Sequence, residues 1–442
     1  MDERSMRDLA ARAISEARAA GAKDSRAFVT RSRDVTVEWR DGKLDRIRES
    51  TAQSLSISLY VDGRFSASGT SDLRPDAVAQ FVRGMVGATR TLAPDPHRHL
   101  PDPARYAGAT QADLQISDPA VATVAPEARL ADARRLEEAA RAGGGDGRIV
   151  SVTAGVGDTE AAWVGMSTNG FDATERSTSF GRSIEVAVRD AGDRKPEGYA
   201  YADACFATDL PSIEVLGAEA LRRADGQRGS KQAPTGVYEV VIENRVVSRL
   251  SRYLFGALAG EDLQQKSSFL EGKLGARIGS ELLTVTSDPH LPRGLATSVW
   301  DSEGMVTSRL PVFEKGVVKT YFLDTYYASK LGAQPTTGEW NNLVWVKGVR
   351  DAAAMIAGMK KGIFVTDFTG GNSNGTTGDF SLGIKGFYVE KGKIAHPVSE
   401  MNLAGNHLEI WKQLAEVGSD PWTSSGNRSP SLRFKKAQCS GT

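Results

Sequence analysis

The strongest constraint on the fold is a pair of Asp-Gly turns, each preceded by a stretch of alternating sequence. Hydrophobic and polar residues alternate over residues 35–39 before Asp41-Gly42, and again over residues 55–61 before Asp62-Gly63. A period of two residues is typical of strands with one buried face, and Asp-Gly is typical of a tight hairpin turn. The sequence therefore predicts an antiparallel meander with one face packed against other elements.

Helical patterns on both sides of this meander indicate what covers its buried face. Hydrophobic residues recur at helical spacing over residues 6–17, where Ser5 and Asp8 form a capping pair, and again over residues 78–86. Each of these segments has one apolar side. We therefore expect both helices to pack on one face of the sheet.

Proline and glycine clusters organise the next part of the chain. Prolines in residues 91–125 predict an extended surface connection. A helix over residues 130–142 is expected to end at the glycines 143–145. Short alternating segments over residues 149–204 predict further strands, and residues 213–224 predict another helix.

The polar stretch over residues 225–230 predicts a boundary between two domains. Residues 1–228 form the expected N-terminal domain, with helices packed on an antiparallel sheet. Residues 229–442 form the expected C-terminal domain, which is β-rich with mostly antiparallel strands and contains an amphipathic helix over residues 246–260. The predicted fold class is therefore α+β.

Charge balance and cysteine content exclude several classes of protein. The 442 residues carry 55 Lys and Arg against 55 Asp and Glu, whereas proteins that neutralise nucleic-acid phosphates carry a basic excess. No run approaches the roughly 20 apolar residues of a membrane span, and the N-terminus lacks the pattern of a secretory signal. Cys205 and Cys439 form no disulfide framework, and Cys205 suits a buried, inert thiol. We expect a cytoplasmic protein that binds neither nucleic acid nor membrane.

Side chains suited to acid–base or metal chemistry are sparse. The chain has five histidines, and no predicted helix carries two of them one turn apart, as a zinc site often requires. His97 and His99 could chelate a metal or lie in a solvent-facing loop, and His290 suits a structural loop. Asp301 and Glu303 could act in acid–base chemistry, bind a cation, or form a solvated turn.

The most unusual segment runs from Thr369 to Asp379 and combines glycines with hydroxyl and amide side chains. Its glycines permit close backbone approach, and its side chains offer donors and acceptors. It lacks the Gly-Lys-Ser/Thr ending of a phosphate-binding loop. We interpret it either as a loop that cradles an extended peptide or as an ordered structural turn. The candidate substrate-binding residues are Gly370, Gly371, Asn372, Ser373, Asn374, Thr376, Thr377, Gly378 and Asp379.

Short motifs spread over nearly the whole chain carry a resemblance to a known family. They are Ser58–Arg64, Ser71–Leu73, Arg252–Gly260, Lys266–Leu270, Asp288–Pro292, Asp301–Gly304, Thr377–Gly383 and Leu403–Asn406. Together they resemble the TldD/PmbA proteins, metalloproteases that are also called modulators of DNA gyrase, and specifically the TldE/PmbA branch of that family.

The resemblance implies that this chain lacks the family's catalytic metal site. In the TldD branch a helix carries His-Glu-x-x-x-His, whose histidines bind zinc while the Glu acts as base, and a Cys nearer the C-terminus completes the site. The matching positions here are Arg252, Tyr253 and Ala257, and the neighbourhood of the family Cys reads Pro421-Trp422-Thr423. Cys439 lies too far along the chain to replace it. The resemblance therefore implies no catalytic residue and no metal in this chain.

The family also implies a role for a metal-free chain. TldE-like proteins pair with TldD-like proteins, which would hold the zinc, and the peptidase site of the heterodimer lies in an enclosed chamber that admits unfolded peptides. The implied substrates are leader segments of ribosomally made peptides, such as microcins, and small unstructured proteins. The segment from Gly370 to Asp379 would shape the chamber, and the helix over residues 246–260 would pack where the partner holds its metal helix.

Two alternatives to this pseudoenzyme interpretation stay open from the sequence. The first is a homodimer that captures unfolded peptides without cleaving them. The second is a standalone hydrolase with an unrecognised site, in which His290 converges with Asp301 and Glu303. Direct involvement with DNA, which the gyrase name suggests, is disfavoured by the balanced charge.

Overall fold

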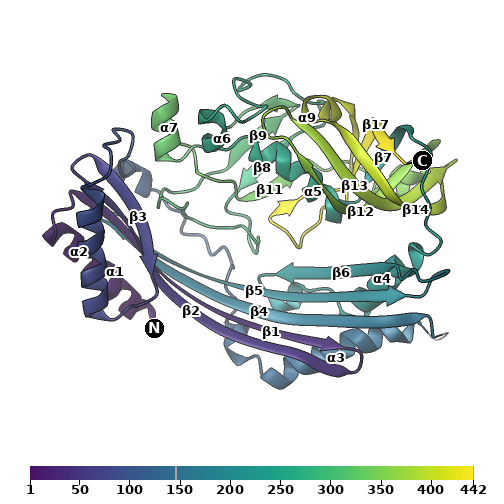
Figure 1. Ribbon diagram of the computed structural model, residues 1–442, viewed down its shortest axis with the longest axis horizontal. Helices are drawn as coiled ribbons and strands as arrows, with labels where there is room; N and C mark the ends of the chain where they lie inside the picture. Colours follow the sequence, from purple (N-terminus) through teal and green to yellow (C-terminus); the bar gives the residue numbers. More distant parts are fainter. Residues whose placement is uncertain (145–146, 442) are drawn as a thin grey trace.

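The computed structural model describes residues 1–144 and 147–441, and within them the longest strands form a six-stranded antiparallel sheet (Figure 1). The strand order is β3-β2-β1-β4-β5-β6. The strands are β1 (Asp24–Arg40), β2 (Lys43–Val61), β3 (Arg64–Thr70), β4 (Ile149–Ser167), β5 (Asp172–Val188) and β6 (Glu197–Ala204). This confirms the predicted meander and extends it with three strands from the following segment.

Both predicted Asp-Gly turns are present. Asp41 and Gly42 join β1 to β2 with φ angles of 47° and 82°, and Asp62 and Gly63 join β2 to β3 with φ angles of 50° and 73°. Two consecutive residues with positive φ match the right-handed twist of the strands that they connect. Asp and Gly tolerate this backbone region better than other residues, which explains why this dipeptide recurs.

Two pairs of helices cover one face of the long sheet. The helices α1 (Glu3–Ala19) and α2 (Pro75–Thr89) pack over one end, where Ala27 and Val29 of β1 are buried. The helices α3 (Pro126–Ala142) and α4 (Ile213–Gly226) pack over the other end, where Val37 and Trp39 of β1 are buried. Because these four β1 residues are all odd-numbered, they point to the same face. The predicted covering of one face is confirmed, with a second helix pair added.

The predicted cap of the first helix is wrong. The side chain of Asp2 accepts a hydrogen bond from the backbone N–H of Ser5 at 2.8 Å, and helix α1 therefore begins at Glu3. The Asp2 carboxylate satisfies the Ser5 N–H group in the first turn of the helix. If Ser5 were the cap, this N–H group would be left to solvent. The helix α3 ends at Ala142, and Gly145 of the predicted glycine stop lies outside the described residues.

The C-terminal half contains a closed sheet around a central helix. Its strand order is β14-β13-β12-β7-β17-β15, and a further pairing between β14 and β17 closes it. The strands are β7 (Gly236–Ile242), β12 (Lys361–Ser373), β13 (Asp379–Glu390), β14 (Lys393–Asn406), β15 (Leu414–Val417) and β17 (Leu432–Ser440). All these pairings are antiparallel except that of β12 with β7.

A second, smaller sheet in this half has the order β10-β9-β8-β11-β16. Its strands are β8 (Val285–Asp288), β9 (Leu310–Glu314), β10 (Val317–Val318), β11 (Asn342–Trp345) and β16 (Asn427–Arg428). Short helices connect the strands, namely α6 (Gly260–Gln264), α7 (Thr325–Leu331), α8 (Ala352–Ala357) and α9 (His407–Ile410). The observed C-terminal half is β-rich, as the sequence predicted.

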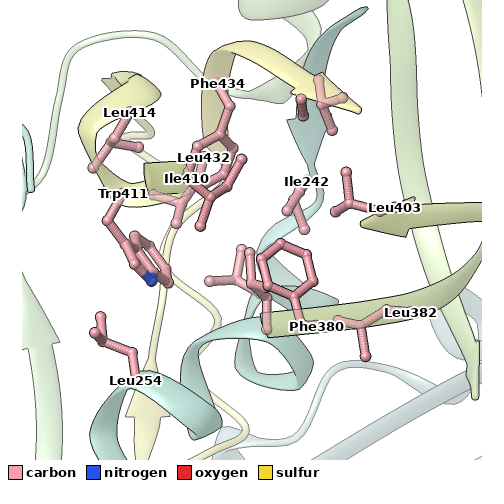
Figure 2. Close-up of a cluster of buried hydrophobic side chains, with 14 of the residues drawn as sticks. Ile242, Leu254, Phe380, Leu382, Leu403, Ile410, Trp411, Leu414, Leu432 and Phe434 are labelled. Atoms are coloured by element: carbon pink, nitrogen blue, oxygen red, sulfur yellow. The ribbon is translucent and has the colours of Figure 1, made fainter. Parts of the chain in front are cut away.

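The largest hydrophobic core lies around the helix α5 (Asn244–Gly256), whose apolar side is buried against the closed sheet. Figure 2 shows Leu254 of α5 below Trp411, with Ile410 and Phe434 beyond it. The rings of Trp411 and Phe434 meet edge to face with centroids 5.7 Å apart, and Trp411 is fully buried. This core fixes the orientation of α5.

The C-terminal half lies across the face of the long sheet opposite to α3 (Figure 1). Polar contacts join the two parts: Arg293 pairs with Asp209 at 2.8 Å, and Ser298 donates to Glu175 at 3.0 Å. The predicted boundary at residues 228/229 stays a prediction, because Gln227 also bonds forward to the carbonyl of Gly386. No helix in the described part of the chain is long and apolar enough to cross a membrane.

Candidate functional site

The helix α5 carries Arg252 and Tyr253, and Ala257 follows it; these are the residues that the resemblance matches to the metal-binding motif of the TldD branch. Arg252 is exposed, and its guanidinium donates to the Tyr253 hydroxyl at 2.6 Å while lying 4.6 Å from the Tyr253 ring centroid. Ala257, immediately after the helix, is buried, and its carbonyl accepts a hydrogen bond from the Ser268 hydroxyl. Arg252 and Tyr253 therefore engage each other, and the backbone of Ala257 is tied to the adjacent loop.

A buried histidine that the sequence did not single out lies beside Tyr253. His407 is completely buried, and its ring stacks on Phe269 at 5.3 Å between centroids, with Phe380 at 4.9 Å and Tyr253 at 6.0 Å. Its Nδ1 accepts from the Trp411 indole N–H at 3.2 Å, whereas its Nε2 has no hydrogen-bond partner among the described residues. Burial lowers the pKa of His407 to about 4, so the ring is neutral near pH 7.

The donors around this helix do not fit a zinc ion. Within the described residues, no group of three His, Cys, Asp or Glu side chains could hold a metal ion. Around His407 the neighbours are aromatic rings rather than further ligands, and a zinc site needs at least three protein ligands. Arginine and alanine cannot supply them.

Both cysteines are buried free thiols, as expected for Cys205. Burial raises the pKa of Cys205, and it raises the pKa of Cys439 to about 12. Trp422, in the neighbourhood of the family Cys, packs edge to face on Tyr201 at 5.5 Å and lies 4.9 Å from the Arg245 guanidinium. Neither thiol has the electropositive, accessible surroundings of a reactive cysteine.

Only part of the glycine-rich segment forms a turn. Gly370 to Ser373 are the last residues of strand β12, and residues 374–378 make a tight turn into β13. The Asn374 side chain accepts from the backbone N–H groups of Thr376 and Thr377 at 2.9 and 3.2 Å, and Asn406 donates to the Thr377 carbonyl at 2.8 Å. The segment is therefore an ordered hairpin. Residues 374–378 fit the alternative of an ordered structural turn, whereas residues 370–373 are strand, which neither alternative included.

The last part of β12 has an open edge. This strand pairs with β7 only over Gly362 to Val365, whereas its pairing with β13 continues to Ser373. From Asp367 onward, the described residues place no strand on the other side of β12, and residues 369–372 are exposed. An open edge offers unpaired backbone groups to an incoming extended chain.

A polar cleft lies between the long sheet and the C-terminal half. One cavity of about 380 Å³ is lined by β12, α4 and α5, and a second of about 460 Å³ lies over the middle of the long sheet. Both include Tyr199 and Tyr201 of β6. Gly155, Gly157 and Gly181 line the second cavity, and neighbouring atoms, among them Ser183 Oγ and Asp203 Oδ1, occupy the space that a Cβ would need. We call these two adjoining cavities the groove, and the start of the open β12 edge lines the first of them.

The hypothetical hydrolase site is not assembled. His290 hydrogen-bonds to the Thr307 hydroxyl at 3.3 Å, and no hydrogen bond joins it to Asp301 or Glu303 in the described chain. The alternative of a solvated turn is also wrong, since both carboxylates are only 8% exposed. Burial and the charge of Glu303 raise the pKa of Asp301 to about 7, and Glu303 pairs with Arg26 at 3.6 Å.

The remaining candidate histidines make separate local contacts. His97 Nδ1 bonds to the Ser329 hydroxyl at 2.9 Å, whereas His99 Nδ1 faces the Leu100 carbonyl at 2.9 Å. Their contacts therefore support structural roles in the loop rather than chelation.

Comparisons with known proteins decide the family. Models of the PmbA/TldA metallopeptidases match in three segments: domain 1 over residues 26–88, the central domain over residues 119–228 and the C-terminal domain over residues 235–441. The chain belongs to the PmbA/TldD metallopeptidase family. Metalloprotease PmbA of Escherichia coli O157:H7 is 30% identical over 417 residues, which cover 93% of this chain and 91% of that protein.

Solved structures of PmbA/TldD relatives agree with the fold. A Bacteroides thetaiotaomicron protein described as a modulator of DNA gyrase is 38% identical, with a TM-score of 0.95 and 98% coverage of both chains. TldE from Thermococcus kodakarensis superposes with a TM-score of 0.87 at 19% identity, covering 99% of this chain and 100% of that one. The second similarity concerns the fold alone.

Proposed function

We propose that this PmbA/TldD family member is the non-catalytic, metal-free subunit of a TldD/TldE-type zinc peptidase heterodimer. The observation that carries the proposal is the set of residues on and just after α5, where Arg252, Tyr253 and Ala257 stand at the positions of the catalytic branch's His, Glu and His. Arginine and alanine are not zinc ligands, and the neighbouring His407 stands among aromatic rings. Zinc would belong to a TldD-like partner.

The role of this subunit would be to hold unfolded peptide near the partner's site. The open edge of β12 can pair with an extended chain through main-chain hydrogen bonds, and the neighbouring groove lies along the long sheet. Every peptide carries the same main-chain donors and acceptors. Such binding suits leader segments of ribosomally made peptides and small unstructured proteins, which share no folded surface.

Co-expression with a metal-bearing TldD-like relative tests the proposal. Size-exclusion chromatography with light scattering should give a one-to-one complex, and only that complex should cleave an unfolded model peptide. Replacing the Glu of the partner's His-Glu-x-x-x-His by Gln should abolish cleavage. His290→Ala in this chain should leave the cleavage rate unchanged, because the hydrogen bonds of His290 in the described residues go to Thr307 and Asp288.

Two outcomes would contradict the proposal. Cleavage by this chain alone, lost in His290→Ala, would establish a standalone hydrolase. A stable homodimer that binds peptide and ignores the TldD-like relative would establish a peptide-binding protein without proteolysis.

A further inference from the structure

An aromatic pocket separate from the α5 region lies between the two halves of the molecule. Its volume is about 490 Å³. Phe28 and Trp163 of the long sheet form one wall, and Trp300 and Trp340 of the C-terminal half form the other. Asp301 also lines the pocket. The two halves thus contribute aromatic faces to one shared space.

Each wall is held in place from behind by further rings. Phe171 is only 2% exposed, and its ring centroid lies 6.0 Å from Phe28, 6.5 Å from Trp163 and 5.4 Å from Trp300. On the opposite side, Trp340 packs 5.6 Å from Phe322. The faces that the pocket presents are therefore set before any ligand arrives, which lowers the entropic cost of binding.

Carboxylate side chains lie in and around the pocket, and Asp301 and Glu339 are among its lining residues. Asp301 Oδ1 accepts from the backbone N–H groups of Glu303 and Met305, whereas its Oδ2 is buried without a hydrogen-bond partner among the described residues. Glu175 lies behind the pocket-lining Ser298, and Glu339 lies at the exposed rim.

Across the described ranges, Asp301, Glu175 and Glu339 form no salt bridge. The nearby cation Arg26 is paired with Glu303. Indole faces and carboxylates together attract a cation rather than a neutral or acidic group.

The aromatic pocket lies on the same face of the long sheet as the groove. Phe28 and Thr30 of β1 line the pocket, and Asp34 and Thr36 of the same strand line the groove. All four side chains are even-numbered and therefore point to one face of the sheet. The step of four residues from Thr30 to Asp34 spans about 13 Å along the strand. An extended peptide in the groove therefore reaches the pocket with a side chain only a few residues away.

We propose that this pocket binds a lysine or arginine side chain of an extended peptide. The inference rests on the proposed peptide-handling function, to which it adds a preference for cationic side chains. The aromatic walls would enclose the aliphatic stem, and the carboxylates in and around the pocket would attract the ammonium or guanidinium group.

Calorimetric titration of the purified chain with capped alanine–serine decapeptides tests the inference. A peptide with one central Lys, or one central Arg, should bind at least tenfold more tightly than the same peptide with norleucine, which matches the stem of lysine without its charge. The preference should weaken as salt is raised. Asp301→Asn should reduce the preference to less than threefold and leave norleucine-peptide binding unchanged.

Controls separate the pocket from general charge effects. Glu281→Gln removes an exposed carboxylate that pairs with Arg277 and is not among the pocket-lining residues. This variant should leave the preference intact. Glu339→Gln, on the exposed rim, gives a second pocket variant if Asp301→Asn does not fold, and it should reduce the preference at least twofold. Equal affinity for lysine and norleucine peptides would overturn the inference. So would binding of N-acetyl-lysine methylamide as tight as that of the peptide, because it would mark a small-amine site.

The two proposals fail in different ways. A chain that forms the complex with its TldD-like partner but shows no preference for cationic side chains overturns only the pocket assignment. A chain that prefers lysine peptides but never pairs with such a partner overturns only the proposed function.

Discussion

At the scale of single residues, two buried ionisable groups impose opposite dependences of stability on pH. His407 is held neutral among aromatic rings, and Asp301 is held close to Glu303 with little solvent. A lowered pKa of a base costs stability in acid, whereas a raised pKa of an acid costs stability in alkali. Each effect belongs to one side chain, so a single substitution isolates it.

Replacing His407 by Phe should make the protein less sensitive to acid. The unfolded chain takes up a proton near the ordinary pKa of 6.5, whereas the folded chain resists protonation until about pH 4. The free energy of unfolding should therefore fall by up to about 3 kcal/mol between pH 6.5 and 4 through this group. Urea denaturation at both pH values should show a smaller fall in the free energy of unfolding for His407→Phe than for the wild type. At pH 7 the variant should be less stable by about 1 kcal/mol, because the Trp411 indole loses its hydrogen-bond acceptor. An unchanged fall would contradict this account.

Replacing Asp301 by Asn should have the reverse pH signature. The Asp301 carboxyl titrates at about 7 when folded and at about 3.8 when unfolded, so ionisation costs stability as the pH rises through this window. Glu303 strengthens this cost and Arg26 opposes it. Relative to wild type, Asp301→Asn should gain up to about 3 kcal/mol between pH 4.5 and 8 in the same denaturation experiment. A constant difference across this range would show that Asp301 titrates normally.

At the scale of elements, the sequence specified local features better than long-range pairings. The Asp-Gly turns and the one-sided helices were predicted because each depends on neighbouring residues and on a simple period. Closure of the sheet by β14 and β17 joins Leu403 to Cys439, and no local pattern marks such a contact. The burial of Asp301 and Glu303 was missed for the same reason, since the packing that removes their solvent comes from distant segments.

The candidate site was only partly visible in the sequence. The glycine-rich segment was singled out by composition, but its first residues are strand because β13 pairs with them as far as Ser373. His407 gave no signal beyond the Leu403–Asn406 motif that precedes it, and its role depends on the rings of Tyr253, Phe269 and Phe380.

The hairpin of β12 and β13 should depend strongly on one glycine. Gly371 has a φ of 104°, and a Cβ there would lie 2.1 Å from the Ser381 carbonyl oxygen. Gly371→Ala should therefore lower the free energy of unfolding by at least about 2 kcal/mol, or locally unfold the hairpin and weaken peptide binding. Gly370→Ala is the matched control for the clash, because Gly370 also has a positive φ, of 148°, whereas its Cβ would meet no atom within 4 Å. Hydrogen exchange of the hairpin amides distinguishes the two; equal protection in both variants would contradict the argument.

At the scale of the whole molecule, the arrangement of two β-rich halves over one groove suits a subunit that holds extended chains. The long sheet lines one cavity of the groove, and the C-terminal half contributes an open strand edge. Membership of the PmbA/TldD family connects this arrangement with peptidases, and the proposed function assigns the metal chemistry to a partner subunit. The central claim therefore concerns where the zinc is held.

The most direct test is the zinc content of each subunit, measured by elemental analysis on the purified chain and on its complex with a TldD-like relative. The account predicts less than about 0.1 zinc per molecule of this chain alone and one zinc per one-to-one complex, because the positions of the two histidines are occupied by arginine and alanine. One zinc per molecule of this chain in isolation, together with cleavage of an unfolded peptide, would contradict it.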